Sequence, residues 1–275
     1  MEALMNIDRR WLFLVVFVIV FGILIHPIGL PIVIGPDAQK AYDYVQGLPA
    51  GSVVWLGIEF NQSSKGELLP MVLAVANQLF KNNDKIVVSG MWQYGTELVQ
   101  PYLESIAQKY GKQYGVDWIN LGWRPGNATF LHQATQDLNA ACAGVDHSGQ
   151  PLSSFPIMQS VKALTPDYFK LAIVFDAGTP GLPDAYIPIV YEPLHLPLLD
   201  GTIQMSVQEN KNYLQAGQIV AMIPGSAGAA QYEKLVGAPG QALASQDPLS
   251  LGALFVTLLV ILGNIGYFAT RGKKA

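Results

Sequence analysis

Four polar residues lie at or just after the ends of four predicted strands, and their types suit them to chemistry. They are Glu59, Gln93, Arg124 and Asp176. Because the carboxyl ends of parallel strands meet at one edge of an α/β sheet, we expect these side chains to lie close together. Two carboxylates, an amide and a guanidinium could bind a small ligand or support hydrolysis there. Loops at this edge are polar in any α/β protein, so the pattern favours ordinary solvated loops over a binding site.

Arg124 is the only arginine between residues 35 and 247, and a Pro–Gly pair follows it. A guanidinium presents a planar fork of donors, so this side chain could clamp a carboxylate or a phosphate. It could instead hold its own loop in place through a salt bridge to Glu59 or Asp176. Structural ion pairs are the commoner use of such a residue, so we predict the salt bridge.

The sequence lacks the usual fingerprints of nucleotide, metal and serine-nucleophile sites. Residues 60–66, after the first strand, contain neither the Rossmann glycine pattern nor a P-loop. Ser226 is flanked by small residues, but Pro224 stands where a nucleophile elbow has glycine. The single cysteine, Cys142, excludes an intramolecular disulfide and is expected in the core. The histidines, His26, His132, His147 and His195, are not at metal-ligand spacing. We therefore expect neither a cofactor nor a metal ion.

The central segment, residues 35–247, alternates short β-rich runs with longer amphipathic stretches. The predicted strands are residues 52–60, 85–91, 116–121, 171–175, 185–191 and 202–207, and the predicted helices are 66–82, 95–110 and 128–143. Strands separated by helices favour parallel pairing with right-handed crossovers. The pattern predicts an α/β domain of the Rossmann-like or flavodoxin-like type, with a mostly parallel sheet and helices on both faces. Pro188 would make the fifth strand an edge or a bulged strand.

Both ends of the chain carry long uncharged segments, and the whole chain is 51% hydrophobic and only 13% charged. Residues 11–34 and 248–270 are each long enough to cross a bilayer as a helix. His26 and Pro27 mark the expected exit of the first helix from the hydrocarbon. The sequence therefore predicts one N-terminal and one C-terminal transmembrane helix flanking the α/β domain.

The basic residues at the two ends predict the orientation in the membrane. Arg9 and Arg10 precede the first apolar segment, and Arg271, Lys273 and Lys274 follow the second. The positive-inside rule puts both clusters in the cytoplasm. Residues 1–10 and 271–275 are thus predicted to be cytoplasmic, and residues 35–247 extracytoplasmic, in a two-pass protein of the plasma membrane.

The charge of the central segment excludes one class of partner. It carries 11 of the 16 Lys and Arg residues but 18 of the 20 Asp and Glu residues. An acidic surface repels nucleic acid and other polyanions. The expected partners are the lipid bilayer and protein subunits, either further copies of this chain or other membrane proteins.

Small residues mark two candidate contact segments. Residues 212–231 are uncharged and contain Gly217, Gly225 and Gly228, and we interpret them as a helix that packs closely either in the domain core or against a neighbouring subunit. In the second apolar segment, Asn264 lies between Gly263 and Gly266. Its amide either pairs with another helix or lies near the lipid headgroups.

Two functional hypotheses remain. The favoured one is a non-enzymatic structural or assembly subunit. A membrane helix at each end of the domain fixes its orientation and its distance from the bilayer, which matters when the domain must contact neighbouring subunits. It predicts a filled carboxyl edge and an apolar surface on residues 212–231. The alternative is a ligand-binding or hydrolytic extracytoplasmic domain. It predicts a concave pocket at that edge, a carboxylate with a perturbed pKa, and Arg124 facing inward.

Overall fold

The computed structural model describes residues 8–25 and 30–271, and it divides into two units. One unit is Val33–Ala242, and the other combines Met1–Ile32 with Leu243–Ala275. Four residues named above lie outside the described residues: His26, Pro27, Lys273 and Lys274.

The unit Val33–Ala242 is built on one six-stranded sheet in which every neighbouring pair of strands is parallel. The strands are β1 (Val53–Glu59), β2 (Lys85–Gly90), β3 (Trp118–Trp123), β4 (Leu171–Asp176), β5 (Leu198–Thr202) and β6 (Ala221–Pro224). Their order is β3-β2-β1-β4-β5-β6, which is the strand order of the Rossmann fold. The α/β prediction is confirmed. In this order the chain changes direction across the sheet between β1 and β4, the position where such folds bind ligands.

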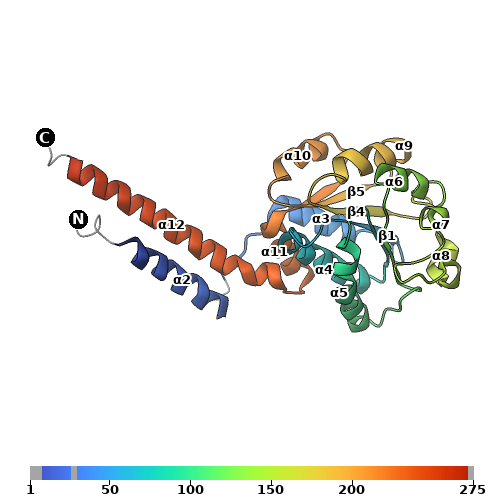
Figure 1. Cartoon of the computed structure of the whole chain (residues 1–275), viewed down its shortest axis with the longest axis horizontal. Helices are drawn as coiled ribbons and strands as arrows, with labels where there is room; N and C mark the ends of the chain where they lie inside the picture. The colour runs from blue at the N-terminus through green and yellow to red at the C-terminus, as the bar shows by residue number, and fades with distance from the viewer. Residues whose placement is uncertain (1–7, 26–29, 272–275) are drawn as a thin grey trace. The chain divides into compact units, whose positions relative to one another are not determined.

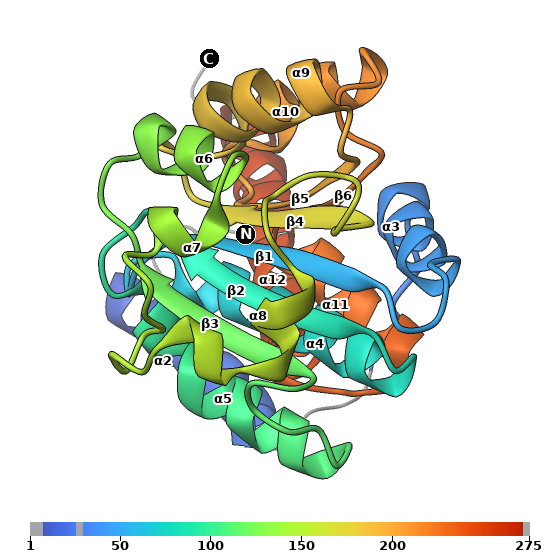
Figure 2. The same ribbon diagram turned by 90° about the vertical axis from the view of Figure 1, so that its right-hand side faces the viewer.

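Helices cover both faces of the sheet (Figure 2). One face carries α3 (Pro36–Gln46), α4 (Lys65–Lys81), α5 (Gly95–Lys109) and α11 (Gly225–Val236). The other carries α6 (Ala128–Ala134), α7 (Leu138–Ala141), α8 (Pro156–Ser160), a π-helix (Leu182–Tyr191), α9 (Glu192–Leu194) and α10 (Val207–Gln215). Because the sheet is covered on both sides, strands such as β4 are buried along their whole length.

Two predicted strands are wrong. The segment 185–191 belongs to the π-helix Leu182–Tyr191, which contains Pro188. A short apolar run fits a strand or a buried helix equally well, and Pro188, which has no N–H to give to a ladder, already argued against a central strand. The strand expected at 202–207 ends instead at Thr202, because β5 occupies Leu198–Thr202.

The helical predictions need three corrections. Residues 128–143 form α6 and α7 rather than one helix, and the Asp137 side chain caps α7 by accepting the Ala140 N–H at 3.0 Å. Residues 212–231 are not one helix, because strand β6 separates α10 from α11. Helix α3, which begins at Pro36, was not predicted.

The second unit contains α2 (Arg9–Ile25) and α12 (Gln241–Arg271). Among the described residues, only α12 is long and apolar enough to cross a membrane, through its stretch Gln241–Ile265. Helix α2, with 17 residues, is apolar but shorter.

Within this unit α2 and α12 lie side by side and run in opposite directions (Figure 1). A Cβ built on Gly252 of α12 would lie 3.8 Å from the Val20 Cγ2 of α2. Five residues earlier in α12, the Asp247 carboxylate accepts the N–H of Leu30, which follows α2 in the sequence, at 2.9 Å. The two helices therefore form an antiparallel pair.

Candidate functional site

The alternation of strand β1 places Trp55, Gly57 and Glu59 on one face of the sheet. Tyr186 of the π-helix packs over Gly57, where a Cβ would lie only 2.8 Å from the Tyr186 Cζ. The Trp55 Nε1–H donates to the Tyr186 oxygen at 3.1 Å, and the Tyr186 O–H donates to the Glu59 Oε1 at 2.9 Å. Because Gly57 has no side chain, the Tyr186 hydroxyl can lie between Trp55 and Glu59 and form a hydrogen bond with each.

Glu59 is completely buried at the end of β1. Its Oε2 accepts the Met91 N–H at 2.7 Å. Burial raises the pKa of Glu59 from its usual value of 4.5 to about 8, and the nearby charge of Asp176 adds to the rise. The hydrogen bonds from Met91 and Tyr186 favour the ionised form but do not offset the loss of water.

Asp176 lies beside Glu59, because the two residues are partners in the register of β1 and β4. Its Oδ2 accepts the Leu182 N–H at 2.7 Å, and the Thr202 hydroxyl of β5 approaches its Oδ1 at 3.4 Å. Burial raises the pKa of Asp176 to about 6. The start of the π-helix is therefore tied to the end of β4.

Asp200 of β5 adds a third buried carboxyl group on the same side of the sheet. Asn210 of α10 donates to its Oδ2 at 2.9 Å and to the Thr202 hydroxyl at 3.2 Å. The Asp200 Oδ1 is buried and has no hydrogen-bond partner among the residues that the structure describes. Burial, followed by the charge of Asp176, raises the pKa of Asp200 well above its usual value. We call Glu59, Asp176 and Asp200 the acidic row.

The loop after β4 closes the carboxyl edge over the acidic row. The Trp92 indole N–H donates to the Pro180 carbonyl at 2.7 Å. This hydrogen bond connects the loop after β2 to the loop after β4. At Gly181 a Cβ would lie 2.5 Å from the Asp176 Oδ2, so this backbone rests directly on the carboxylate. Glu59 and Asp176 are 0% and 2% exposed. In this conformation neither carboxylate can contact a substrate.

A hollow of about 570 Å³ opens at the same edge, beside the loops after β1 and β2. It is lined by Asn61, Gln62, Tyr94, Glu97 and Leu98. Tyr94 is 66% exposed and has a left-handed backbone with φ of 69°, a conformation that non-glycine residues seldom adopt. This hollow, and not the acidic row, is where a small molecule could reach the edge.

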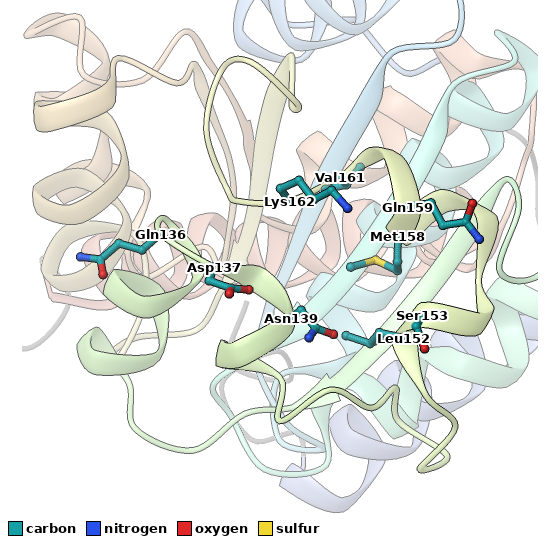
Figure 3. A pocket seen from close by; sticks show the side chains of 9 residues that line it. All are labelled: Gln136, Asp137, Asn139, Leu152, Ser153, Met158, Gln159, Val161 and Lys162. Atoms are coloured by element: carbon teal, nitrogen blue, oxygen red, sulfur yellow. The ribbon is translucent and has the colours of Figure 1, made fainter.

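A second hollow of about 490 Å³ lies beside α7 and α8, and none of the acidic row lines it (Figure 3). Its lining mixes uncharged polar side chains with the apolar Leu152, Met158 and Val161, and Asp137 and Lys162 are its ionisable members. Ser153 and Gln159 are exposed members of the lining.

The structure brings together two of the four predicted site residues. Glu59 and Asp176 are neighbours, whereas Gln93 is exposed. Arg124 does not join them, because its Nη2 donates to the Val145 carbonyl at 2.5 Å. The predicted salt bridge of Arg124 to Glu59 or Asp176 is therefore wrong: in the described part of the chain these two carboxyl groups accept from Met91, Tyr186, Leu182 and Thr202 instead. The expectations of the ligand-binding hypothesis are thus met only in part, since the carboxylates are perturbed but the guanidinium faces elsewhere.

Sequence reasoning missed Tyr186, Asp200, Thr202 and Asn210. Asp200 did carry a signal, because it ends the short apolar run 196–199 and is followed by glycine. The contact of Tyr186 carried none, because it depends on a π-helix that packs back on β1. Within residues 8–25 and 30–271, no group of three or more His, Cys, Asp or Glu residues is arranged to hold a metal ion.

The three glycines of the predicted contact segment 212–231 have different local surroundings. Gly225 and Gly228 are buried in the domain, and a Cβ on Gly228 would lie 2.6 Å from the Pro224 Cδ. Gly217 is exposed, with φ of 75°, and follows the end of α10 as helix-terminating glycines do. Core packing thus accounts for Gly225 and Gly228, while a contact with another subunit stays a prediction.

In α12, Gly263 has open space around it, and the Asn264 amide donates to the Val260 carbonyl of its own helix at 2.9 Å. Gly266 lies in the same helix, but its surroundings are outside the described part. Pairing of Asn264 with another helix stays a prediction.

In comparisons with known proteins, no protein-family model and no curated protein matches this chain.

Proposed function

We propose that this chain is a two-pass membrane protein that presents its α/β domain outside the cytoplasm as a non-enzymatic structural or assembly subunit. The observation that carries the proposal is the filled carboxyl edge. The position between β1 and β4, where Rossmann-type domains bind ligands, is occupied by Tyr186 and by the loop latched through Trp92. A switch point filled by the chain's own side chains suits a domain whose surface, rather than its cleft, is used.

The membrane part of the proposal rests on the antiparallel pair of α2 and α12. Helix α12 has a stretch of suitable length and composition, and α2 lies antiparallel to it. An antiparallel pair brings Arg9 and Arg10 to the same end as Arg271. This arrangement agrees with both basic clusters being cytoplasmic. The partners would be lipid together with further copies of the chain or other membrane subunits.

The test of the assembly role is the mass of the particle released from the membrane with its native lipid. The proposal expects a mass of several chains, with the same companions recovered at fixed ratio. A particle of one chain, with no copurifying protein, would refute the role.

A second candidate function is the binding of a small ligand at the hollow lined by Tyr94. Its support is the strained and exposed tyrosine beside the switch point, because unusual backbone conformations gather at binding sites. A thermal-shift screen of small polar molecules would test it. A ligand of this hollow should lose its effect in Gln62→Ala and keep it in Gln159→Ala, which makes the same change in the other hollow. Equal responses of the two variants would exclude binding at the hollow.

A further inference from the structure

A groove of about 470 Å³ lies between α4 and α5 within the unit Val33–Ala242. Its walls include Leu69, Leu73, Tyr102, Ile106 and Lys109. It is closed at one side by residues 237–241, which connect α11 to α12. We call it the α4–α5 groove.

The α4–α5 groove is amphipathic. Leu73 and Ile106 are half-buried and present apolar surface to the groove, and Tyr102 is exposed at its rim. Lys109 lies in the lining, with its ammonium group donating to the Asn77 Oδ1 at 3.0 Å. A molecule with an apolar chain and an anionic group would match this combination of surfaces.

The segment that closes the groove is held firmly by a buried acid. Glu233 of α11 is 3% exposed, and its two carboxylate oxygens accept the Gly240 N–H at 3.0 Å and the Ala242 N–H at 3.2 Å. These bonds fix residues 237–241 against the groove. The Glu233 charge is therefore engaged with backbone amides, and it leaves Lys109 as the cation of the lining.

Gln241 connects the groove to the predicted membrane helix, because it both lines the groove and begins α12. The first large exposed apolar residue of α12 is Leu249. Eight residues of helix correspond to about 12 Å along the axis. The headgroup layer on each side of the hydrocarbon is roughly 5–8 Å thick. If α12 spans the bilayer, this short connection joins the lining residue Gln241 to the part of α12 that enters the hydrocarbon.

We propose that the α4–α5 groove binds one phospholipid of the membrane, with an acyl chain between Leu73 and Ile106 and the phosphate beside Lys109. This inference rests on the membrane anchoring proposed above. The occupant follows from the chain connection through Gln241, because lipid is the amphiphile that surrounds a membrane-spanning α12 at high concentration. A bound lipid would cover apolar side chains that the domain itself leaves uncovered.

The test uses the full chain in nanodiscs that contain a phospholipid with a photoreactive group on its acyl chain. Cross-linked peptides are mapped by mass spectrometry in the wild type, Ser105→Trp and Ser153→Trp. Ser105 is an exposed member of the groove lining, so a tryptophan there fills the groove at little cost to the core. Ser153→Trp makes the same change in the hollow of Figure 3.

The proposal expects cross-links on residues 69–74 and 102–109 in the wild type and in Ser153→Trp, and their loss in Ser105→Trp. Lys109→Gln should weaken the preference for anionic over zwitterionic lipid by about threefold, in the range of an exposed ion pair, whereas Lys162→Gln should not. Cross-links confined to α2 and α12 would overturn the groove proposal and leave the anchoring intact. A chain without lipid cross-links that alkaline carbonate releases from membranes would overturn both. Occupation of the groove by a second protein chain would overturn the lipid proposal alone.

Discussion

Replacing Glu59 by glutamine should remove a large part of the pH dependence of the domain's stability. Burial raises the pKa of Glu59 from 4.5 to about 8, so the folded protein holds a proton that the unfolded chain releases. Stability from this group is fully present below the unfolded pKa and is lost as the pH rises toward about 8. A glutamine amide at this position is neutral at every pH and occupies nearly the same volume.

The size of the effect follows from the shift. Each pKa unit corresponds to about 1.4 kcal/mol, so between about pH 5 and pH 8 the wild type should lose roughly 3 kcal/mol more stability than Glu59→Gln. For a chain of this size that is a difference of about 6–12 °C in melting temperature. Asp176, whose pKa is raised to about 6, contributes a similar pH dependence of stability to both proteins. Its effect therefore cancels when the two proteins are compared.

The assay is thermal unfolding of the full chain in detergent, followed by tryptophan fluorescence across this pH range. The buried Trp55 and Trp118 report on the domain. Glu192→Gln, which changes an exposed glutamate, is the control and should follow the wild type. Parallel curves for the wild type and Glu59→Gln would refute the reasoning. They would mean that the donors on Met91 and Tyr186 keep the Glu59 carboxylate ionised despite its burial.

Three further predictions concern the same side of the sheet. Tyr186→Phe should cost about 2–4 kcal/mol in urea unfolding at neutral pH, because it leaves the Trp55 N–H and the Glu59 carboxyl group buried without their shared partner. An unchanged urea midpoint would contradict this. Gly57→Ala should lower stability by about 1–3 kcal/mol in the same measurement, because its Cβ would displace the Tyr186 ring, and a neutral result would disprove the close approach. Cys142 is fully buried, and burial raises the pKa of its thiol to about 11, so a maleimide should label it only after denaturation. Rapid labelling of the native protein would show that this part of the core opens.

The buried strands and their edge could be predicted from the sequence. The runs that form β1, β2 and β4 combine β-branched residues with flanking turn residues, and their predicted ends agree with the structure to within about two residues, as such patterns allow. The proximity of Glu59 and Asp176 followed from the geometry of parallel sheets. Nothing about long-range contacts was needed for either inference.

The closure of the edge could not be predicted in this way. Tyr186 reaches Glu59 across 127 positions of sequence, from a π-helix that was expected to be a strand. Arg124 was expected at a carboxylate but donates to a carbonyl in a neighbouring loop. Both contacts depend on how loops fold back over the sheet, and local periodicity does not report on that. The sequence therefore indicated where a site would be, but not that its own side chains fill it.

Labelling of both chain ends in sealed vesicles tests the membrane arrangement most directly. Small epitope tags are placed before Met1 and after Ala275, and protease is added to right-side-out vesicles. The account predicts that the α/β domain is digested while both tags stay protected until the vesicles are opened. Digestion of one tag with protection of the other, or survival of the domain in sealed vesicles, would contradict it.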